Sequence, residues 1–216
     1  ALPDARTFAR HVGAMGISAD DTIVVYDGPG VFSAPRVWWM FRAMGHGDVA
    51  VLDGGFEAWR SAGGAIEDLP PHFHADRHFT VRPRRDLGRD IGQMKSTATT
   101  KTAQIVDARA APRFRGEVEE PRPGLRRGRI PGSINVPFAN VIAPDGRMKS
   151  EDELKAVFDK AGVDLNKPII NTCGSGVTAA ILALAQSLAG HDDAAVYDGS
   201  WSEWGKPESE TPVETG

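Results

Sequence analysis

The apolar residues of this chain gather in short runs that are separated by polar and glycine-rich segments. The first run spans residues 23–26 and is rich in Val and Ile, so it predicts a buried strand. A glycine-rich turn follows, then a helical pattern over residues 33–44 and a second strand over 49–52. Apolar strands that feed helices through tight turns are typical of a parallel sheet with helices on both faces.

The second half of the chain carries the same kind of pattern. Three further apolar runs predict strands at residues 104–106, 134–136 and 168–170. Ser150 and Glu153 have the spacing of a capping box, which predicts a helix that Gly162 ends. A second helix, rich in Ala and Leu, is expected over residues 178–188, and Gly190 stops it. The chain as a whole therefore belongs to the α/β class.

These two halves are related by an internal repeat. A shift of 146 places residues 27–31 on residues 173–177, and a shift of 145 places the Asp-Gly pair at 53–54 on the pair at 198–199. The glycines of the turn are kept, but Asp27 stands where the second copy has Cys173. We therefore expect one copy to carry chemistry and the other to act as a scaffold.

The repeat also predicts a division into domains. The second copy has strands and a helix upstream of its turn that have no counterpart before Ala1, so we expect the first domain to lack its N-terminal portion. About 50 or more residues would precede Ala1 in the native protein, by typical domain size. The predicted units are the C-terminal part of a non-catalytic domain at 1–65, a Pro-rich linker at 66–92 and a catalytic domain at 93–216.

Composition narrows the functional classes. The chain has 216 residues, of which 41% are hydrophobic and 25% charged, which excludes a disordered or collagen-like protein. A net charge of -4 argues against a general nucleic-acid binder. No run of eighteen apolar residues and no basic leader followed by an apolar stretch is present, so we expect a cytoplasmic protein without a membrane segment.

Cys173, the single cysteine, is the strongest candidate for chemistry because it cannot form an internal disulfide. It ends an apolar strand and precedes a glycine-rich turn and a helix. Such a turn directs successive N–H groups inward, and the helix N-terminus favours negative charge, so a thiolate would be stabilised there. The alternative is a buried, inert cysteine. A cysteine phosphatase is disfavoured, because Ala179 stands where its loop needs an arginine.

The loop at residues 173–179, Cys-Gly-Ser-Gly-Val-Thr-Ala, resembles the active-site loop of the 3-mercaptopyruvate sulfurtransferases, which belong to the tandem-domain rhodanese family. Further similar motifs lie at residues 33–40, 53–56, 107–109, 113–114, 120–122, 130–132 and 197–204. The resemblance implies two rhodanese-like domains, each a parallel-stranded sheet flanked by helices. Thiosulfate-preferring relatives usually carry Arg then Lys after the cysteine, where this chain has Gly174 and Ser175.

The resemblance also implies the roles of individual residues. Arg113 and Arg122 are expected to bind the substrate carboxylate and carbonyl, a task that suits the planar guanidinium. They could instead belong to a solvated charged face with Glu117, Glu119 and Glu120. Ser175 is expected to hydrogen-bond the substrate sulfur or relay its proton. The remaining expected substrate-binding residues are Gly174, Gly176, Val177 and Thr178, the last of which could also simply cap the helix.

The expected reaction moves the sulfur of 3-mercaptopyruvate through a persulfide on Cys173 to an acceptor, with release of pyruvate. The acceptor would be a thiol, such as that of thioredoxin, or cyanide, and no metal or organic cofactor is required. Two alternatives stay open: a thiosulfate sulfurtransferase, and a non-catalytic module that carries or binds sulfur. His72, His74 and His78 cluster in the predicted linker, but without a ligand pattern they indicate a surface coincidence and not a metal site.

Overall fold

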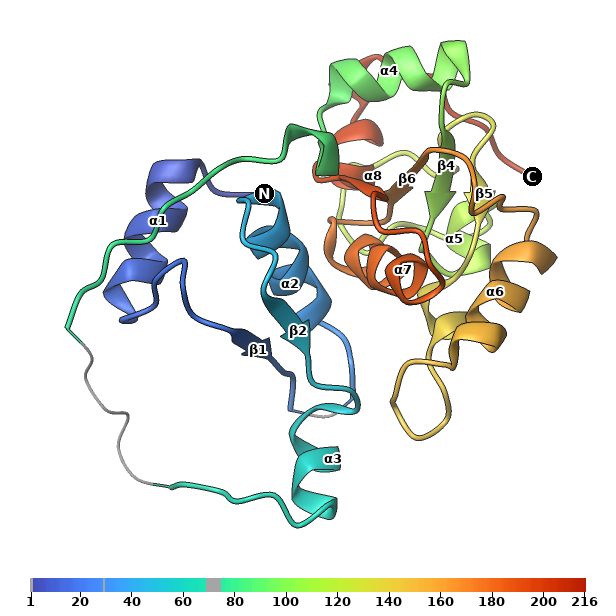
Figure 1. The fold of residues 1–216 in the computed structure, drawn as a ribbon. Coiled ribbons are helices and arrows are strands. Elements are labelled where there is room, and N and C mark those ends of the chain that lie inside the picture. Colours follow the sequence, from blue (N-terminus) through green and yellow to red (C-terminus); the bar gives the residue numbers. More distant parts are fainter. Residues whose placement is uncertain (1, 29, 69–74) are drawn as a thin grey trace.

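The computed structural model describes residues 2–28, 30–68 and 75–216, which form two parallel sheets (Figure 1). The first sheet pairs β1 (Ile23–Val25) with β2 (Val49–Val51). The second has the order β3-β7-β6-β4-β5, with all its ladders parallel. Its strands are β3 (Gly88–Arg89), β4 (Gln104–Asp107), β5 (Ile134–Asn135), β6 (Ile169–Thr172) and β7 (Ala195–Tyr197). The parallel α/β class expected from the apolar runs is therefore confirmed.

Within the described residues, the first unit contains three α-helices, of which the sequence predicted one. That helix is α2 (Ala34–Ala43), expected over 33–44, and Pro35 lies in its first turn. The sequence patterns did not indicate α1 (Ala5–Ala14) or α3 (Gly55–Ser61). Helix α3 is short and begins at two glycines with left-handed backbone, which is a poor helix signal. Asp4 starts α1 by accepting a hydrogen bond from the N–H of Thr7 at 2.9 Å.

The segment that the sequence assigned to a linker, residues 66–92, is more structured than expected. Phe79 is buried and packs edge-to-face on Phe8 and Phe41. Residues 85–89 form a 3-10 turn and strand β3, which pairs with β7. The expectation of a surface linker is therefore wrong for this stretch, because a two-residue edge strand has no apolar run to reveal it. Pro70, Pro71, His72 and His74 lie outside the described residues.

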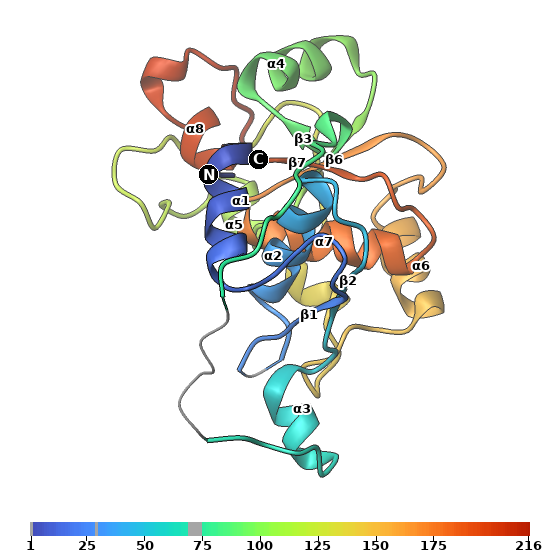
Figure 2. The same ribbon diagram turned by 60° about the vertical axis from the view of Figure 1, so that its left-hand side comes forward.

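The second unit has helices on both faces of its sheet (Figure 2). They are α4 (Ile91–Thr100), α5 (Ala111–Phe114), α6 (Glu151–Lys160), α7 (Val177–Leu188) and α8 (Ser200–Trp204). Successive strand residues alternate between the two cores: Ile105 and Ile170 pack with α4 and α8, whereas Val106 and Ile169 pack with α6 and α7. Within the described residues, no helix is both long enough and apolar enough to cross a bilayer.

The two units share one hydrophobic core. Helices α2 and α7, which are equivalent in the repeat, lie side by side across the boundary (Figure 2). The two Asp-Gly aspartates of the repeat also cross it. Asp53 accepts a hydrogen bond from the N–H of Met148 at 2.8 Å, and Asp198 forms an ion pair with Arg36 of α2. Each copy therefore contacts the other through the aspartate of its Asp-Gly pair.

The capping box at the start of α6 confirms a detail of the sequence prediction. The side chain of Ser150 and that of Glu153 each bond to the other's backbone N–H, and the helix ends just before Gly162, whose φ is 81°. A second capping box, which the sequence analysis missed, joins Asp90 and Gln93 at the start of α4.

Candidate active site

Cys173 lies directly after β6 and before α7, at the carboxyl edge of the five-stranded sheet. This edge is where parallel α/β sheets place their binding sites. The residue is 1% exposed, and a pocket of about 520 Å³ opens beside it. Of the residues expected at the site, Arg113, Arg122, Gly174, Ser175, Val177 and Thr178 all line this pocket together with Cys173. The structure thus brings together residues that lie up to 65 positions apart, from 113 to 178.

The loop after Cys173 curls around the sulfur as the sequence predicted. The Sγ atom accepts hydrogen bonds from the N–H of Gly176 at 3.0 Å and from that of Ser175 at 3.4 Å. Gly176 has φ of +83°, and a Cβ there would lie 2.9 Å from the carbonyl oxygen of Asp198. Only glycine therefore fits this position, and the N–H groups it presents favour a negatively charged sulfur.

Three consecutive residues of the 200–202 segment hold the backbone of Cys173 and Gly174. The Oγ of Ser200 accepts a hydrogen bond from the N–H of Cys173 at 3.2 Å. The N–H of Trp201 donates to the carbonyl of Cys173, and that of Ser202 donates to the carbonyl of Gly174, both at 2.9 Å. Ser200 is fully buried with φ of +49°, a costly conformation for a residue with a side chain. The sequence analysis noted Ser200 and Ser202 only within the family-like motif at 197–204 and gave them no role.

Arg113 and Arg122 both lie against Gly174 of the loop. A Cβ on Gly174 would lie 3.0 Å from Nη2 of Arg113, so the guanidinium is packed directly against the loop backbone. Arg122 donates to the hydroxyl of Ser202 and, at 3.4 Å, to the carbonyl of Gly174. Two cations therefore border the pocket into which Cys173 faces, an arrangement that suits a small anionic ligand.

The alternative of a solvated charged face is wrong for Arg113. Its partner Glu120 has a side chain only 2% exposed and binds the guanidinium at 2.5 Å. The other two acids of that face point elsewhere: Glu117 pairs with Arg115, and Glu119 pairs with Arg127.

Glu120 belongs to a buried chain of charges that the sequence analysis did not find. One of its oxygens binds Arg109 at 2.9 Å, and Arg109 in turn binds Asp107 at 2.6 Å. Burial acts to lower the pKa of Arg109, but the two carboxylates outweigh it and the pKa is raised. The guanidinium also lies 4.3 Å from the ring centre of Trp201. This network fixes Glu120, and through it Arg113. Residues 107–109 were noted in the sequence only as a family-like motif.

The first copy fills its own loop with a carboxylate. Asp27 accepts hydrogen bonds from the N–H groups of Phe32, Ser33 and Ala34 at 2.7 to 3.1 Å, and from the Ser33 hydroxyl. Burial acts to raise the pKa of Asp27, but these hydrogen bonds lower it overall. Phe32 extends from this loop to the wall of the Cys173 pocket, where it packs edge-to-face on Phe138 at 5.9 Å. The first copy therefore contributes a wall of the pocket.

The histidines of the described segments take no part in this pocket. His46 and His191 bond to the backbone carbonyls of Asp48 and Leu165, which agrees with a structural role in their turns. His78 is exposed. Among residues 2–28, 30–68 and 75–216, no group of three or more His, Cys, Asp or Glu side chains is arranged to hold a metal ion.

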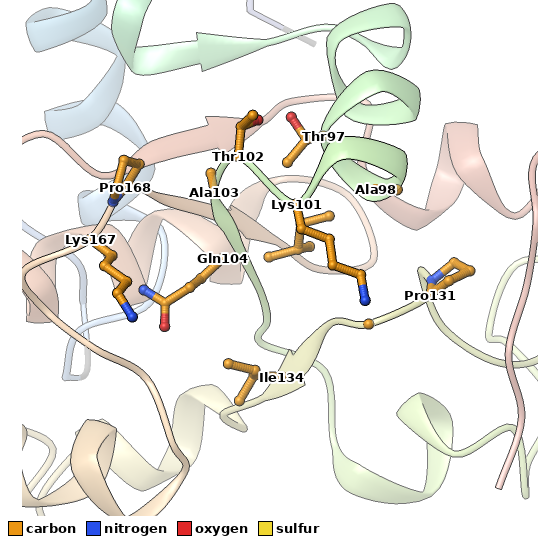
Figure 3. Close-up of a pocket in the computed structure, with 12 residues that line it drawn as sticks. Thr97, Ala98, Lys101, Thr102, Ala103, Gln104, Pro131, Ile134, Lys167 and Pro168 are labelled. Carbon is orange, nitrogen blue, oxygen red and sulfur yellow. The ribbon is translucent and has the colours of Figure 1, made fainter.

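A second pocket of about 300 Å³ lies at the opposite edge of the sheet, where β4 begins (Figure 3). Lys101 and Lys167 border it together with Gln104. The amide of Gln104 is already bonded to the backbone of Asp164 in both directions. This pocket is separate from Cys173, and we assign it no part in the chemistry.

The chain is similar to several proteins of known family. The family model of the rhodanese-like domain matches residues 2–62 and 90–207, one segment for each copy of the repeat, which confirms the fold class expected from the sequence. A 3-mercaptopyruvate sulfurtransferase of Rattus norvegicus is 44% identical over 212 residues, which cover 94% of this chain and 69% of the relative. A thiosulfate sulfurtransferase of the same organism is 47% identical over 206 residues, with the same two coverages.

Among solved structures, SseA from Escherichia coli is described as having the "Rhodanese" fold and is assigned to the 3-mercaptopyruvate sulfotransferases. It matches with a TM-score of 0.82 and 39% identity, over 94% of this chain and 75% of its own.

Proposed function

This chain is a sulfurtransferase of the rhodanese family, and from that premise we propose that Cys173 takes the sulfur of 3-mercaptopyruvate as a persulfide and passes it to a thiol or cyanide acceptor. The observation that carries the proposal is the position of Sγ. This atom accepts hydrogen bonds from two N–H groups of the loop and faces a pocket bordered by Arg113 and Arg122. A nucleophile and two cations for an anionic substrate are thus in one place.

In the first half of the reaction, the Cys173 thiolate attacks the sulfur of 3-mercaptopyruvate. An S–S bond forms and the C–S bond breaks, and its electron pair goes to the substrate carbon as the enolate of pyruvate. The proton of the substrate thiol ends on that carbon, so pyruvate leaves and Cys173 carries an anionic persulfide. We assign to Ser175, which lines the pocket, the relay of this proton.

Arg113 and Arg122 orient the substrate in this scheme. A keto acid has a planar carboxylate beside a carbonyl, and guanidinium groups match both through pairs of parallel N–H donors. Arg113 is held by the buried Glu120, so it is positioned before the substrate arrives and little freedom is lost on binding. Ser202 anchors Arg122 in the same way.

In the second half, the acceptor removes the outer sulfur. A thiolate attacks it, the S–S bond to Cys173 breaks, and its electron pair returns to Sγ as the thiolate. The N–H groups of Ser175 and Gly176 stabilise the negative charge on sulfur at the start and end of the cycle. The scheme needs no metal or organic cofactor, and it predicts ping-pong kinetics. We keep thioredoxin as the proposed protein acceptor and the cytoplasm as the proposed location.

A thiosulfate donor is the second candidate, favoured by the 47% identity to a thiosulfate sulfurtransferase. Overall identity does not separate the two donors, since the mercaptopyruvate relative is 44% identical. The loop does favour one of them. Thiosulfate carries two negative charges, and Gly174 and Ser175 add no cation to Arg113 and Arg122. The singly charged keto acid therefore suits this pocket better.

Mass spectrometry of the intact protein after exposure to each donor tests the proposal. Because Cys173 is the single cysteine, a gain of about 32 Da identifies the persulfide there. Mercaptopyruvate should produce it with release of pyruvate, and faster turnover of thiosulfate with release of sulfite would contradict the donor assignment. Cys173→Ser should abolish the gain and keep the fold. No gain with either donor would favour the module that only carries or binds sulfur.

A further inference from the structure

We propose that Arg36, a residue of the first copy, positions the sulfur-binding loop of the second. The inference rests on the sulfur transfer proposed above, because it assigns to the non-catalytic copy a part in the same reaction. Arg36 lies in α2, and its side chain is only 12% exposed. It is a positioning residue, since it contacts the loop from outside the pocket that holds Sγ and does not line that pocket.

Arg36 contacts the loop and its neighbour together. Nη1 donates to the carbonyl oxygen of Gly176 at 3.3 Å, and Nη2 forms the ion pair with Asp198. Its guanidinium carbon also lies 4.5 Å from the ring centre of Trp39, which leaves the group little room to move. One side chain thus joins α2 to the glycine of the catalytic loop and to the Asp-Gly turn after β7.

Gly176 is the point at which such a contact matters most. Its N–H donates to Sγ of Cys173 at 3.0 Å, while its carbonyl accepts from Arg36. The peptide groups on both sides of this residue are therefore anchored, one by the sulfur and one by the arginine. Glycine has the widest conformational freedom of any residue, so without an outer anchor the N–H would not be held in line with the sulfur.

This contact is not a general feature of the repeat. The position equivalent to Arg36 in α7 is Leu182, which is fully buried. Asp53, the equivalent of Asp198, accepts a backbone N–H and, among the described residues, forms no ion pair with an arginine. The loop of the first copy binds the carboxylate of Asp27 and has no sulfur. Its N–H groups therefore need no side chain from the other domain to orient them.

Arg36 also neutralises a charge beside the loop. A Cβ at Gly176 would lie 3.4 Å from Oδ1 of Asp198, so this carboxylate adjoins the turn that receives the negative sulfur. Its other oxygen accepts the N–H of Leu2 at 2.6 Å, which carries no net charge. Loss of Arg36 would leave an unpaired anion there and disfavour the thiolate. The other charged side chains at the pocket, Arg109, Arg113, Glu120 and Arg122, would be unchanged.

Arg42 provides a matched control on the same helix. It also crosses to the second copy, where Nη2 donates to the carbonyl of Asp192 at 3.1 Å, and it lies over the ring of Trp38 at 4.6 Å. Its side chain is 16% exposed, close to the value for Arg36. Arg42→Met therefore removes a comparable contact between the copies without touching the loop.

The experiment compares Arg36→Met, Arg42→Met and the wild type in two assays. The first is the rate of persulfide formation at increasing mercaptopyruvate. The second is the rate of alkylation of Cys173 by iodoacetamide from pH 5 to 9, which requires no sulfur transfer. For Arg36→Met we expect the limiting rate of persulfide formation to fall about tenfold, because a reacting group is misplaced. The half-saturating donor concentration should change little. The alkylation profile should shift to higher pH.

Arg42→Met should match the wild type in both assays, even where its melting temperature falls as much as that of Arg36→Met. Equal effects of the two variants would overturn the inference, because they would reflect domain docking alone. In both assays the values for Arg36→Lys should lie between those of the wild type and Arg36→Met. A single ammonium group then replaces a guanidinium that donates to two acceptors. Failure of the wild type to take sulfur from either donor would refute the proposed function instead. In that case an unshifted alkylation profile in Arg36→Met would still overturn the role of Arg36.

Discussion

Asp27 and Cys173 occupy equivalent positions in the two copies, and each directs its side chain at the backbone N–H groups of the loop that follows it. In the first copy the acceptor is a carboxylate, which permanently occupies the N–H groups of the loop. In the second it is a sulfur beside an open pocket. The repeat therefore uses one loop design for a fixed anion in one copy and for the atom that we propose to react in the other.

Asp27→Asn tests the stabilising part of this relationship. The variant keeps an acceptor oxygen but loses the charge at the start of α2, so we expect a loss of about 1 kcal/mol in the free energy of unfolding at pH 7. Because the folded-state pKa of Asp27 is lowered, its contribution is present above the unfolded value near 3.8 and disappears as the pH falls through the lower folded value. Urea unfolding at pH 7 and at pH 2.5 measures both effects.

The two proteins should converge in stability at the lower pH. A difference between wild type and Asp27→Asn that stayed constant from pH 7 to pH 2.5 would show that the charge of Asp27 is not what the loop stabilises.

Much of the fold could be predicted from the sequence because its core elements are apolar and the repeat shows their order. Strands β1, β2, β4 and β6 and helices α2 and α7 follow directly from such runs. The strand β3 and the short helices α3 and α5 could not be found this way. Strand β3 has only two residues, and its pairing with the distant strand β7 is what defines it.

The residues of the candidate site also differ in whether the local sequence could reveal them. Cys173 and its glycines are adjacent in sequence, so loop chemistry revealed them, and the resemblance supplied Arg113 and Arg122. Ser200 and Arg36 reach their partners in the loop, Cys173 and Gly176, only through the tertiary fold, from 27 and 140 positions away in the chain. A polar residue whose partner lies on another element has no local pattern that shows its contact. The two residues were therefore noted only within family-like motifs, and their roles were not predicted.

Gly176→Ala should separate backbone strain from damage to the loop. Gly162 is the matched control, because its φ of +81° is close to the +83° of Gly176 but a Cβ there meets no atom within 4 Å. Both substitutions should cost about 1 kcal/mol or more from the left-handed backbone alone. Only Gly176→Ala adds a contact of 2.9 Å with the carbonyl of Asp198, so only it should also lose persulfide formation.

Thermal melting and mass spectrometry of the persulfide would be measured on both glycine variants. Retention of wild-type sulfur uptake in Gly176→Ala would mean that the loop tolerates a shift of this turn, contrary to the geometry of its N–H groups.

Glu120→Gln should destabilise the protein strongly. Its carboxylate, only 2% exposed, is shared between Arg109 and Arg113, and removing one partner of a buried ion pair costs about 3–5 kcal/mol. We also expect the KM for mercaptopyruvate to rise, since Arg113 loses the group that holds it. Glu119→Gln makes the same chemical change at an exposed carboxylate paired with Arg127. It should change neither the midpoint of urea unfolding nor the KM. Comparable losses in the two variants would contradict the role given to the buried network.

Ser175→Lys should move the donor preference toward thiosulfate. Ser175 lines the pocket, and a cation there would favour a donor with two negative charges over one with a single charge. We expect the ratio of thiosulfate to mercaptopyruvate turnover to rise about tenfold, equivalent to about 1.4 kcal/mol. Ser175→Met, which is similar in length but uncharged, should lower both rates without that change in ratio. Because this rise in the turnover ratio is electrostatic, it should be smaller at 500 mM salt than at 50 mM salt. A ratio that rose equally in Ser175→Met, or that did not respond to salt, would show that pocket shape, and not charge, selects the donor.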